Sequence, residues 1–148
     1  MVNILVCDDD KEIAGALEIY LRNEGYNVFK AYDGMEALNI VKQNQIHLIL
    51  MDVMMPNLDG IQATMKIREE NNIPIIMLSA KSEDYDKIIG LNVGADDYIT
   101  KPFNPLELIA RVKSHLRRFT RLGSMDAESK EGIYTSGGLE VDDNEKKI

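Results

Sequence analysis

Two short apolar segments of this chain end in carboxylates. The segment Ile4–Cys7 runs directly into Asp8 and Asp9, and the segment Leu48–Met51 runs into Asp52. Ionised carboxylates about 4 Å apart repel by roughly 4 kcal/mol per pair at an effective dielectric near 20, so a cluster of them needs a divalent, oxygen-preferring cation such as Mg²⁺. A carboxylate beside such a cation can attack phosphorus. The first hypothesis from these residues is therefore phosphoryl transfer to an aspartate.

The elements that must position these carboxylates follow from hydrophobic periodicity. Short apolar runs predict strands, and the stretches between them repeat apolar residues at helical spacing. The longest helical pattern, Leu106–Leu116, follows Pro105, which suits a first turn. The predicted strands are Asn3–Cys7, Val28–Ala31, Leu48–Met51, Pro74–Leu78 and Asp97–Ile99.

Alternating strands and helices predict an α/β fold with a doubly wound parallel sheet. Ligands of such sheets bind at the carboxyl ends of the strands. In a flavodoxin-like (βα)5 sheet of strand order 2-1-3-4-5 the first and third strands are neighbours, so Asp8, Asp9 and Asp52 meet at one edge. The same edge should receive Ser79 and Lys101. By contrast, Asp10 and Asp59 are expected to cap helices, and His47 and His115 to lie outside the site.

Composition limits the classes of function. The chain has 148 residues, 45% hydrophobic content and a formal net charge of -8. The acidic balance argues against nucleic-acid binding by this stretch itself, because phosphate contacts need clustered Lys and Arg. The single cysteine, Cys7, fits a reducing compartment, and the sequence contains neither a membrane-length apolar stretch nor a secretory signal. We therefore expect a cytoplasmic protein without a membrane partner.

Four ordered motifs carry a resemblance to a known family. They are Val6–Asp10, Met51–Gly60, Leu78–Ala80 and Asp96–Phe103. Together they resemble the receiver domains of two-component response regulators, from Val2 to about Arg118. The run from Asp96 to Arg111 is also similar to the VanR regulators within the OmpR/PhoB subfamily.

The resemblance implies a metal site around a phosphoacceptor. Asp52 accepts the phosphoryl group, and Mg²⁺ is the expected cofactor, with Mn²⁺ able to substitute. The implied ligands are Asp8 through water, Asp9, Asp52 and the backbone carbonyl of Met54.

The resemblance also implies residues that bind the phosphoryl group and respond to it. The Ser79 hydroxyl and the Lys101 ammonium group contact phosphoryl oxygens. Because the added group carries a charge of about -1.5 to -2, it pulls Ser79 inward, and Tyr98 fills the space that Ser79 leaves. The peptide between Lys101 and Pro102 is expected to be cis, a geometry of low cost only before proline.

A dimer face is implied by the OmpR/PhoB likeness. Charges of both signs suit a two-fold contact in which each patch meets its copy, with Lys87 expected to pair with Glu107 and Asp97 with Arg111. An ordinary solvated surface is the alternative. The expected face comprises Lys87, Ile88, Leu91, Asp96, Asp97, Glu107, Ala110 and Arg111.

The sequence changes character towards its end. Residues 1–119 are predicted to form the receiver domain, and residues 120–132, which are polar, a linker. Residues 133–148 contain two strand-like pieces around a Gly-Gly pair and resemble the truncated start of a winged-helix DNA-binding domain, without its recognition helix.

The expected function is that of a response regulator in a two-component system. A sensor histidine kinase donates the phosphoryl group, the protein dimerises on phosphorylation, and it controls transcription through DNA contacts of the missing C-terminal domain. It is expected not to be an enzyme, beyond catalysing its own phosphorylation and dephosphorylation. Two alternatives stay open: a stand-alone phosphorelay receiver, and a phosphatase with an aspartyl nucleophile, although such phosphatases resemble a different layout with Asp-x-Asp after the first strand.

Overall fold

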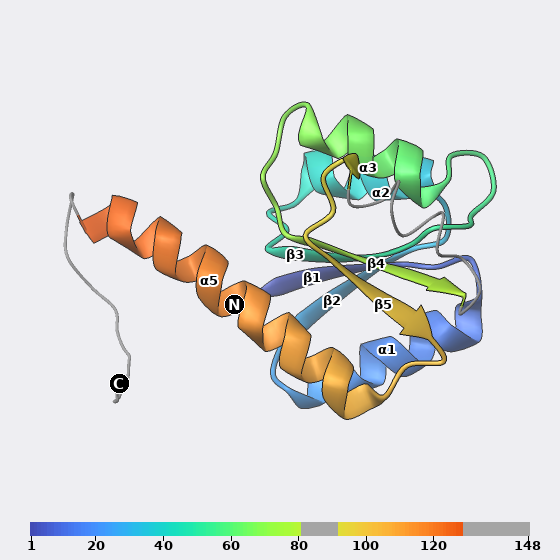
Figure 1. The fold of residues 1–148 in the computed structure, drawn as a ribbon, viewed down its shortest axis with the longest axis horizontal. Coiled ribbons are helices and arrows are strands. Elements are labelled where there is room, and N and C mark those ends of the chain that lie inside the picture. The colour runs from blue at the N-terminus through green and yellow to red at the C-terminus, as the bar shows by residue number, and fades with distance from the viewer. Residues whose placement is uncertain (81–91, 129–148) are drawn as a thin grey trace. The chain divides into compact units, whose positions relative to one another are not determined.

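The structure is a computed structural model that describes residues 1–80 and 92–128. These residues form five strands and four helices, whose arrangement is drawn in Figure 1. In chain order the elements are β1 (Asn3–Cys7), α1 (Lys11–Asn23), β2 (Asn27–Ala31), α2 (Gly34–Gln43), β3 (Leu48–Asp52), α3 (Gly60–Arg68), β4 (Ile75–Ala80), β5 (Asp97–Lys101) and α5 (Pro105–Glu128).

The strands form one parallel sheet in the order β2-β1-β3-β4-β5. This order confirms the predicted flavodoxin-like fold. In the register, Cys7 lies opposite both Ala31 and Met51, so the carboxyl ends of the three strands are level. Strand β3 ends at Asp52 and β5 at Lys101, each beyond the predicted strand end, so two predicted site residues are the last residues of strands.

The two faces of the sheet carry separate hydrophobic cores, because successive side chains of a strand point to opposite faces. Leu5 and Met51 pack into the core that includes α2 and α3, whereas Ile4 and Leu50 pack into the core that includes α1 and the start of α5. Figure 1 shows α2 and α3 on one face of the sheet and α1 on the other. Full burial of such a side chain contributes about 1.5–3 kcal/mol, so burial on both faces holds the central strands in place.

Three helices begin at aspartates. The carboxylates of Asp10, Asp33 and Asp59 accept hydrogen bonds from backbone N–H groups in the first turns of α1, α2 and α3. These bonds satisfy donors that a helix leaves without a partner at its start. The cap roles predicted for Asp10 and Asp59 are confirmed.

The chain divides into two compact units, Met1–Leu116 and Arg117–Ile148. Helix α5 extends to Glu128, so the first part of the predicted linker, residues 120–132, is helical. Five of the residues in that part are of types that favour helix: Arg121, Leu122, Met125, Ala127 and Glu128. The later linker residues and residues 133–148 lie outside the described chain, so the winged-helix start stays a prediction. Among the described residues, no helix is long and apolar enough to cross a bilayer.

Candidate functional site

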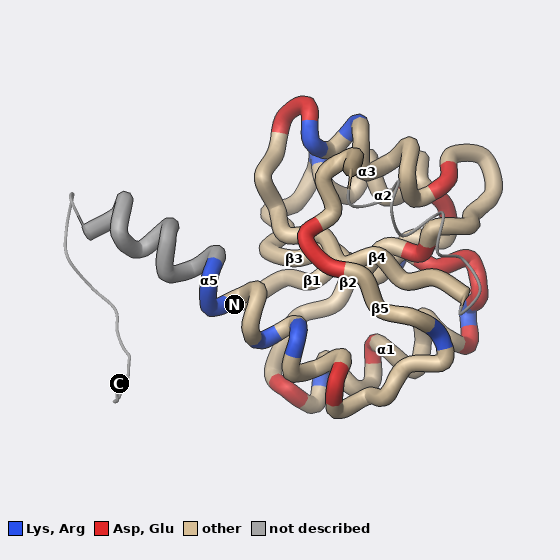
Figure 2. The backbone as a smooth tube through the Cα atoms, viewed as in Figure 1, with Lys and Arg blue, Asp and Glu red and all other residues tan. Residues whose placement is uncertain are grey.

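Three carboxylates meet at the carboxyl edge of the sheet. Asp8 and Asp9 follow β1, and Asp52 ends the adjacent strand β3. One carboxylate oxygen of each lies within 4.8 Å of the others. Asp8 and Asp52 are buried, and Asp9 is exposed. The arrowheads of β4 and β5 in Figure 1 point toward one edge of the sheet, and Figure 2 shows acidic segments at that edge. We call these three residues the acidic cluster, and they are close enough to share one cation.

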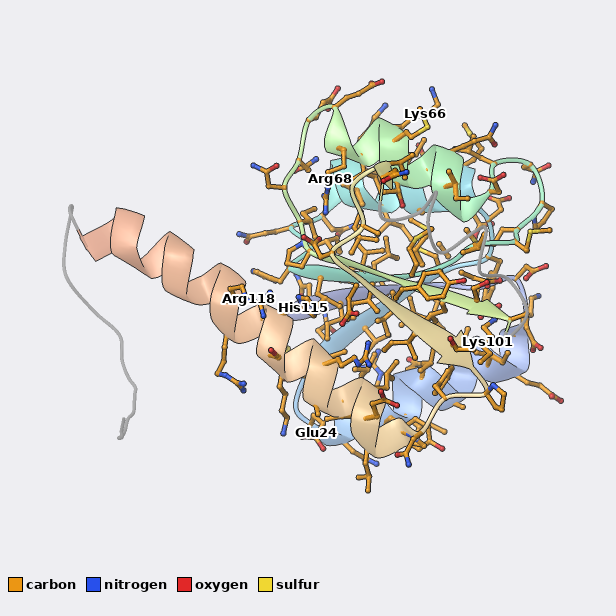
Figure 3. All side chains as sticks on the ribbon, viewed as in Figure 1. Glu24, Lys66, Arg68, Lys101, His115 and Arg118 are labelled. Carbon is orange, nitrogen blue, oxygen red and sulfur yellow. The ribbon has the colours of Figure 1, made fainter. Side chains whose placement is uncertain are left out.

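Lys101 contacts two members of the acidic cluster. Its Nζ lies 2.9 Å from Oδ2 of Asp8 and 3.2 Å from Oδ1 of Asp52. Figure 3 labels Lys101 at the end of β5. The second oxygen of Asp8 accepts a hydrogen bond of 2.9 Å from the backbone N–H of Asp10. One ammonium group thus contacts two of the three carboxylates, and the cluster keeps a negative charge that attracts a further cation.

Burial and charge set the protonation states of the site. Burial, followed by the charge of Asp8, raises the pKa of Asp52 to about 6, although Lys101 opposes the shift. Burial lowers the pKa of Lys101, but hydrogen bonds and charges of Asp8 and Asp52 outweigh it and leave the pKa above its ordinary value. Burial also raises the pKa of Cys7, with the charges of Asp8 and Asp52 adding to it. At neutral pH the site therefore holds a charged lysine, an ionisable Asp52 and a neutral thiol.

Ser79 lies near the carboxyl end of β4, and Tyr98 lies earlier on the neighbouring strand β5. The buried Ser79 Oγ has no hydrogen-bond partner among the described residues. Tyr98 is 9% exposed and belongs to the core on the α2 and α3 face, with Met77 opposite it in the ladder. Because side chains alternate along β4, Ser79 shares the face of Met77 and Tyr98. A buried hydroxyl without a partner costs about 1–3 kcal/mol, so an incoming hydrogen-bond acceptor would be stabilised there.

The loop between β3 and α3 carries Met54, whose side chain is 66% exposed. The end of this loop packs closely against β3: a Cβ on Gly60 would lie 2.0 Å from the carbonyl oxygen of Asp52. The Gly60 N–H also donates a 2.9 Å hydrogen bond to the carbonyl of Val53. Only glycine permits this approach. The oxygen donors of the acidic cluster, with the predicted Met54 carbonyl on this loop, fit a hard divalent cation.

Arg111, expected on the dimer face, contacts residues of its own chain. Its Nη1 lies 2.9 Å from Oδ1 of Asp97 and 3.1 Å from the carbonyl oxygen of Tyr98, and its Nη2 lies 2.8 Å from Oε2 of Glu107. The pairing of these residues across a dimer stays a prediction. Three further residues of the expected face lie outside the described part of the chain: Lys87, Ile88 and Leu91.

The remaining residues of the expected face differ in their surroundings. Ala110 is exposed, whereas Oδ2 of Asp96 accepts hydrogen bonds from Arg68 at 2.7 Å and from the backbone N–H of Ile75 at 2.8 Å. The two histidines lie away from the acidic cluster. His115, which Figure 3 labels, has its Nε2 3.0 Å from Oδ2 of Asp97. His47 lies at the opposite ends of the strands, where its Nδ1 accepts a hydrogen bond from the first residue of β1.

One contact near the site was not predicted from the sequence. Asn57, in the loop between β3 and α3, donates a 2.7 Å hydrogen bond from Nδ2 to Oδ2 of Asp33, and the Gly34 N–H donates to the carbonyl of Leu58 at 2.9 Å. The spacing of Asp33 and Glu36 is that of a capping box and could have located the start of α2. No local signal connects that helix start with Asn57, because the two segments meet only in the fold.

A cavity of about 410 Å³ adjoins Lys101. It lies where α1, the end of β4 and the loop after β5 meet, and its lining is largely apolar. The Lys101–Pro102 peptide is cis, as expected. The lining residues are Ile13, Ala80, Lys101, Pro102 and Phe103.

Comparison with known proteins identifies the class of protein to which this fold and this acidic site belong. The family model described as the response regulator receiver domain matches residues 4–113. The chain belongs to the response regulator receiver domain family.

Individual relatives show which regulators of this family the chain resembles. The chain is 48% identical over 141 residues to the regulatory protein VanR of Enterococcus faecium, covering 95% of this chain and 61% of that protein. It is 49% identical over 115 residues to the response regulator GtcR of Aneurinibacillus migulanus, covering 78% of this chain and 48% of that protein. These matches confirm the resemblance to VanR-type regulators. The chain spans between 48% and 61% of the length of these two curated relatives.

A solved structure agrees with this family assignment and with the fold. The structure titled as the receiver domain of the Francisella response regulator 1452 is 43% identical to the chain, with a TM-score of 0.75, and the match covers 80% of this chain and 98% of that one.

Proposed function

We propose that the chain accepts a phosphoryl group on Asp52 and is the input part of a response regulator that controls transcription. The observation that carries this proposal is the acidic cluster with Lys101 inside it. Asp52 is a buried carboxylate with a pKa of about 6, and an ammonium group lies 3.2 Å from one of its oxygens. That combination supplies a carboxylate nucleophile next to a group that can pair with phosphoryl oxygens.

In the proposed reaction an ionised oxygen of Asp52 attacks the phosphorus of a phosphohistidine. A P–O bond forms while the P–N bond breaks, and the imidazole leaves with a proton taken from solvent. Lys101 pairs with the charge on one phosphoryl oxygen, and the hydroxyl of Ser79 donates a hydrogen bond to another. The buried Ser79 hydroxyl, which lacks a partner among the described residues, supports this role.

Asp8, Asp9, Asp52 and the Met54 carbonyl would hold Mg²⁺, for which Mn²⁺ can substitute. Bound there, the ion supplies neutralisation of phosphoryl charge. The protein catalyses only its own phosphorylation and dephosphorylation and is not an enzyme toward other substrates.

The proposed donor is a sensor histidine kinase. A histidine that reaches Asp52 must come with a surface that lies beside the acidic cluster. The cavity of about 410 Å³ next to Lys101 offers such a surface, because Ile13 and Phe103 line it. Burial of apolar area there would hold the donor in line with Asp52.

The proposed readout runs from Ser79 through Tyr98 to the dimer face. Once the phosphoryl group holds the Ser79 hydroxyl, Tyr98 moves into the space behind it. Arg111 donates to the Tyr98 carbonyl at 3.1 Å, so a shift of this strand changes the partners of Arg111. Arg111 then exchanges its contact with Asp97 for the same residue of a second copy. DNA contacts belong to a C-terminal domain of the full-length protein.

The direct test is chemical labelling. Incubation of the purified chain with acetyl phosphate and Mg²⁺, followed by mass spectrometry, should show one phosphoryl group per chain on Asp52. Asp52→Asn should show none, because an amide is not a nucleophile here. Asp10→Asn is the matched control, since asparagine caps a helix as well as aspartate does.

The same incubation separates the competing classes of function. Undiminished labelling of Asp52→Asn would refute the assignment of the phosphoacceptor. Continuous release of phosphate from acetyl phosphate, faster than the phosphorylated Asp52 of a regulator would hydrolyse, would favour the phosphatase. Dimerisation is tested by sedimentation equilibrium with and without the phosphodonor, and Arg111→Glu should weaken the phosphate-dependent dimer.

A further inference from the structure

We propose that the hydrogen bond between Asp33 and Asn57 holds the loop between β3 and α3 in the conformation that the metal site requires. Asp33 and Asn57 are then positioning residues: neither belongs to the acidic cluster, and both act through the loop that carries Met54. The inference rests on the proposed function of that cluster as a Mg²⁺ site.

The contact fixes the middle of the loop. Asn57 has a left-handed backbone conformation, with φ of 66°, which asparagine adopts more readily than most residues but still at a cost. Its side-chain amide donates to Oδ2 of Asp33 at 2.7 Å. The other oxygen of Asp33 accepts from the backbone N–H of Glu36 at 2.8 Å. The carboxylate is therefore held by α2, and through it Asn57 is held as well.

Two glycines anchor the same loop further along. The Gly34 N–H donates to the carbonyl of Leu58 at 2.9 Å, and a Cβ on Gly34 would lie 2.3 Å from that oxygen. At the end of the loop, a Cβ on Gly60 would lie 2.0 Å from the carbonyl oxygen of Asp52. The loop is thus fixed by β3 at its two ends and by α2 near its middle. Met54 lies between Asp52 and the anchors formed with α2, so their loss frees its backbone.

The Asp33 carboxylate is charged under the conditions in which the metal site is proposed to bind its ion. Hydrogen bonds from the Glu36 N–H and from Asn57 hold the pKa of Asp33 below its ordinary value. The Asp33 carboxylate is therefore ionised at neutral pH and can accept both hydrogen bonds. Loss of a partner that orients a metal ligand typically costs 10–100-fold in affinity. Because this contact acts through backbone, we expect about tenfold, the low end of that range.

The test is a titration of the 148-residue chain with Mn²⁺, in which electron paramagnetic resonance reports the free ion. Asn57→Ala and Asp33→Ala should each raise the dissociation constant about tenfold, and Asn57→Asp should raise it at least as much, because two carboxylates then face each other. The double variant Asp33→Asn with Asn57→Asp should restore it to within about twofold of the parent, a difference below 1 kcal/mol. In that swap the asparagine introduced at position 33 still caps α2 through its oxygen and donates its amide to the new carboxylate.

A matched control removes a similar bond far from the site. Asn27 donates from Nδ2 to Oδ1 of Asn3 at 3.1 Å at the opposite edge of the sheet, so Asn27→Ala should lower stability without changing Mn²⁺ affinity.

The outcomes separate this inference from the proposed function. If the parent does not bind Mn²⁺, the proposed metal site itself fails. If the parent binds and Asn57→Ala binds equally well, or if the reciprocal swap is no better than Asn57→Asp alone, the positioning role is overturned while the proposed function stands.

Discussion

The two ends of β1, β2 and β3 are stabilised in opposite ways. At the amino ends of these three strands, here called the amino edge, neutral hydrogen bonds join the elements: the Asn3 N–H donates to Nδ1 of His47 at 2.9 Å, its side-chain amide donates to the carbonyl of Gln45 at 2.6 Å, and Asn27 donates to Asn3 at 3.1 Å. Each of these bonds has a donor matched to an acceptor, and none of them involves a charged group.

The carboxyl edge is the reverse. Asp8, Asp9 and Asp52 lie close together there, with Lys101 contacting Asp8 and Asp52, and the buried hydroxyl of Ser79 has no partner among the described residues. The same sheet thus ends in a satisfied edge and an unsatisfied one. Repulsion at the acidic edge therefore lowers the stability of the free domain, and a cation bound there would relieve it.

The largest expected effect is that of removing the Lys101 ammonium group at the carboxyl edge on the rate of phosphorylation. Lys101→Met removes the ammonium group that faces the phosphoryl oxygens while keeping the stem, so the rate of phosphoryl incorporation from acetyl phosphate should fall by about 10²–10³. Asn27→Ala at the amino edge should leave this rate unchanged. A fall in this rate of less than about tenfold in Lys101→Met would lie below the range for loss of a single charge-stabilising donor. It would show that Lys101 does not stabilise the transferring phosphoryl group.

Metal addition and removal should act on one edge alone. Free Mg²⁺ at 100 times its dissociation constant should raise the free energy of unfolding of the parent by about 2.7 kcal/mol, and excess EDTA should reverse the gain. Asp52→Asn should gain clearly less, because one ligand is lost. Urea unfolding with and without Mg²⁺ measures both values, and equal gains in the two proteins would contradict the ligand role of Asp52.

The pH dependence of stability should show the repulsion directly. Asp52 has a pKa of about 6 in the folded protein and about 3.9 when unfolded, so the folded state binds more protons, and the free domain loses stability as pH rises through this window. In EDTA, Asp52→Asn should therefore match the parent near pH 4 and exceed it above pH 6, by roughly 1–3 kcal/mol. Urea unfolding across this range checks it; a parent that gains stability relative to the variant as pH rises would reverse the sign.

The smallest effect is expected at the amino edge. Asn27→Ala should lower the free energy of unfolding by about 1 kcal/mol, the net contribution of a typical hydrogen bond, at every pH between about 4 and 8. Thermal unfolding in EDTA measures it. If this change instead altered metal binding or labelling, the two edges would be coupled, and the contrast between them would not hold.

The acidic cluster was predictable because its parts are local. An apolar run followed by Asp8 and Asp9, and another followed by Asp52, identify strand ends from composition alone, and the order of elements makes those strands neighbours. The sheet rule also placed Ser79 at this edge, but the roles of Ser79 and Tyr98 needed the family resemblance, since a serine or a tyrosine near a strand carries no distinctive pattern.

Other features could not be read locally. Helix α5 continues into residues that composition predicted as a linker, because polar composition and helix propensity give conflicting signals there. Arg111 contacts Asp97 and Glu107 within its own chain, a choice of partner that charge alone leaves open.

By itself, the sequence determined the strand and helix pattern, the parallel sheet and the gathering of three aspartates at one edge, because periodicity and chain order act through local preferences and a few rules of connection. Tertiary structure alone decided the elevated pKa of Asp52, the absence of a partner for Ser79 among the described residues, and the contact of Asp33 with Asn57. These depend on burial and on distances between segments far apart in the chain, which exist only once the sheet has packed.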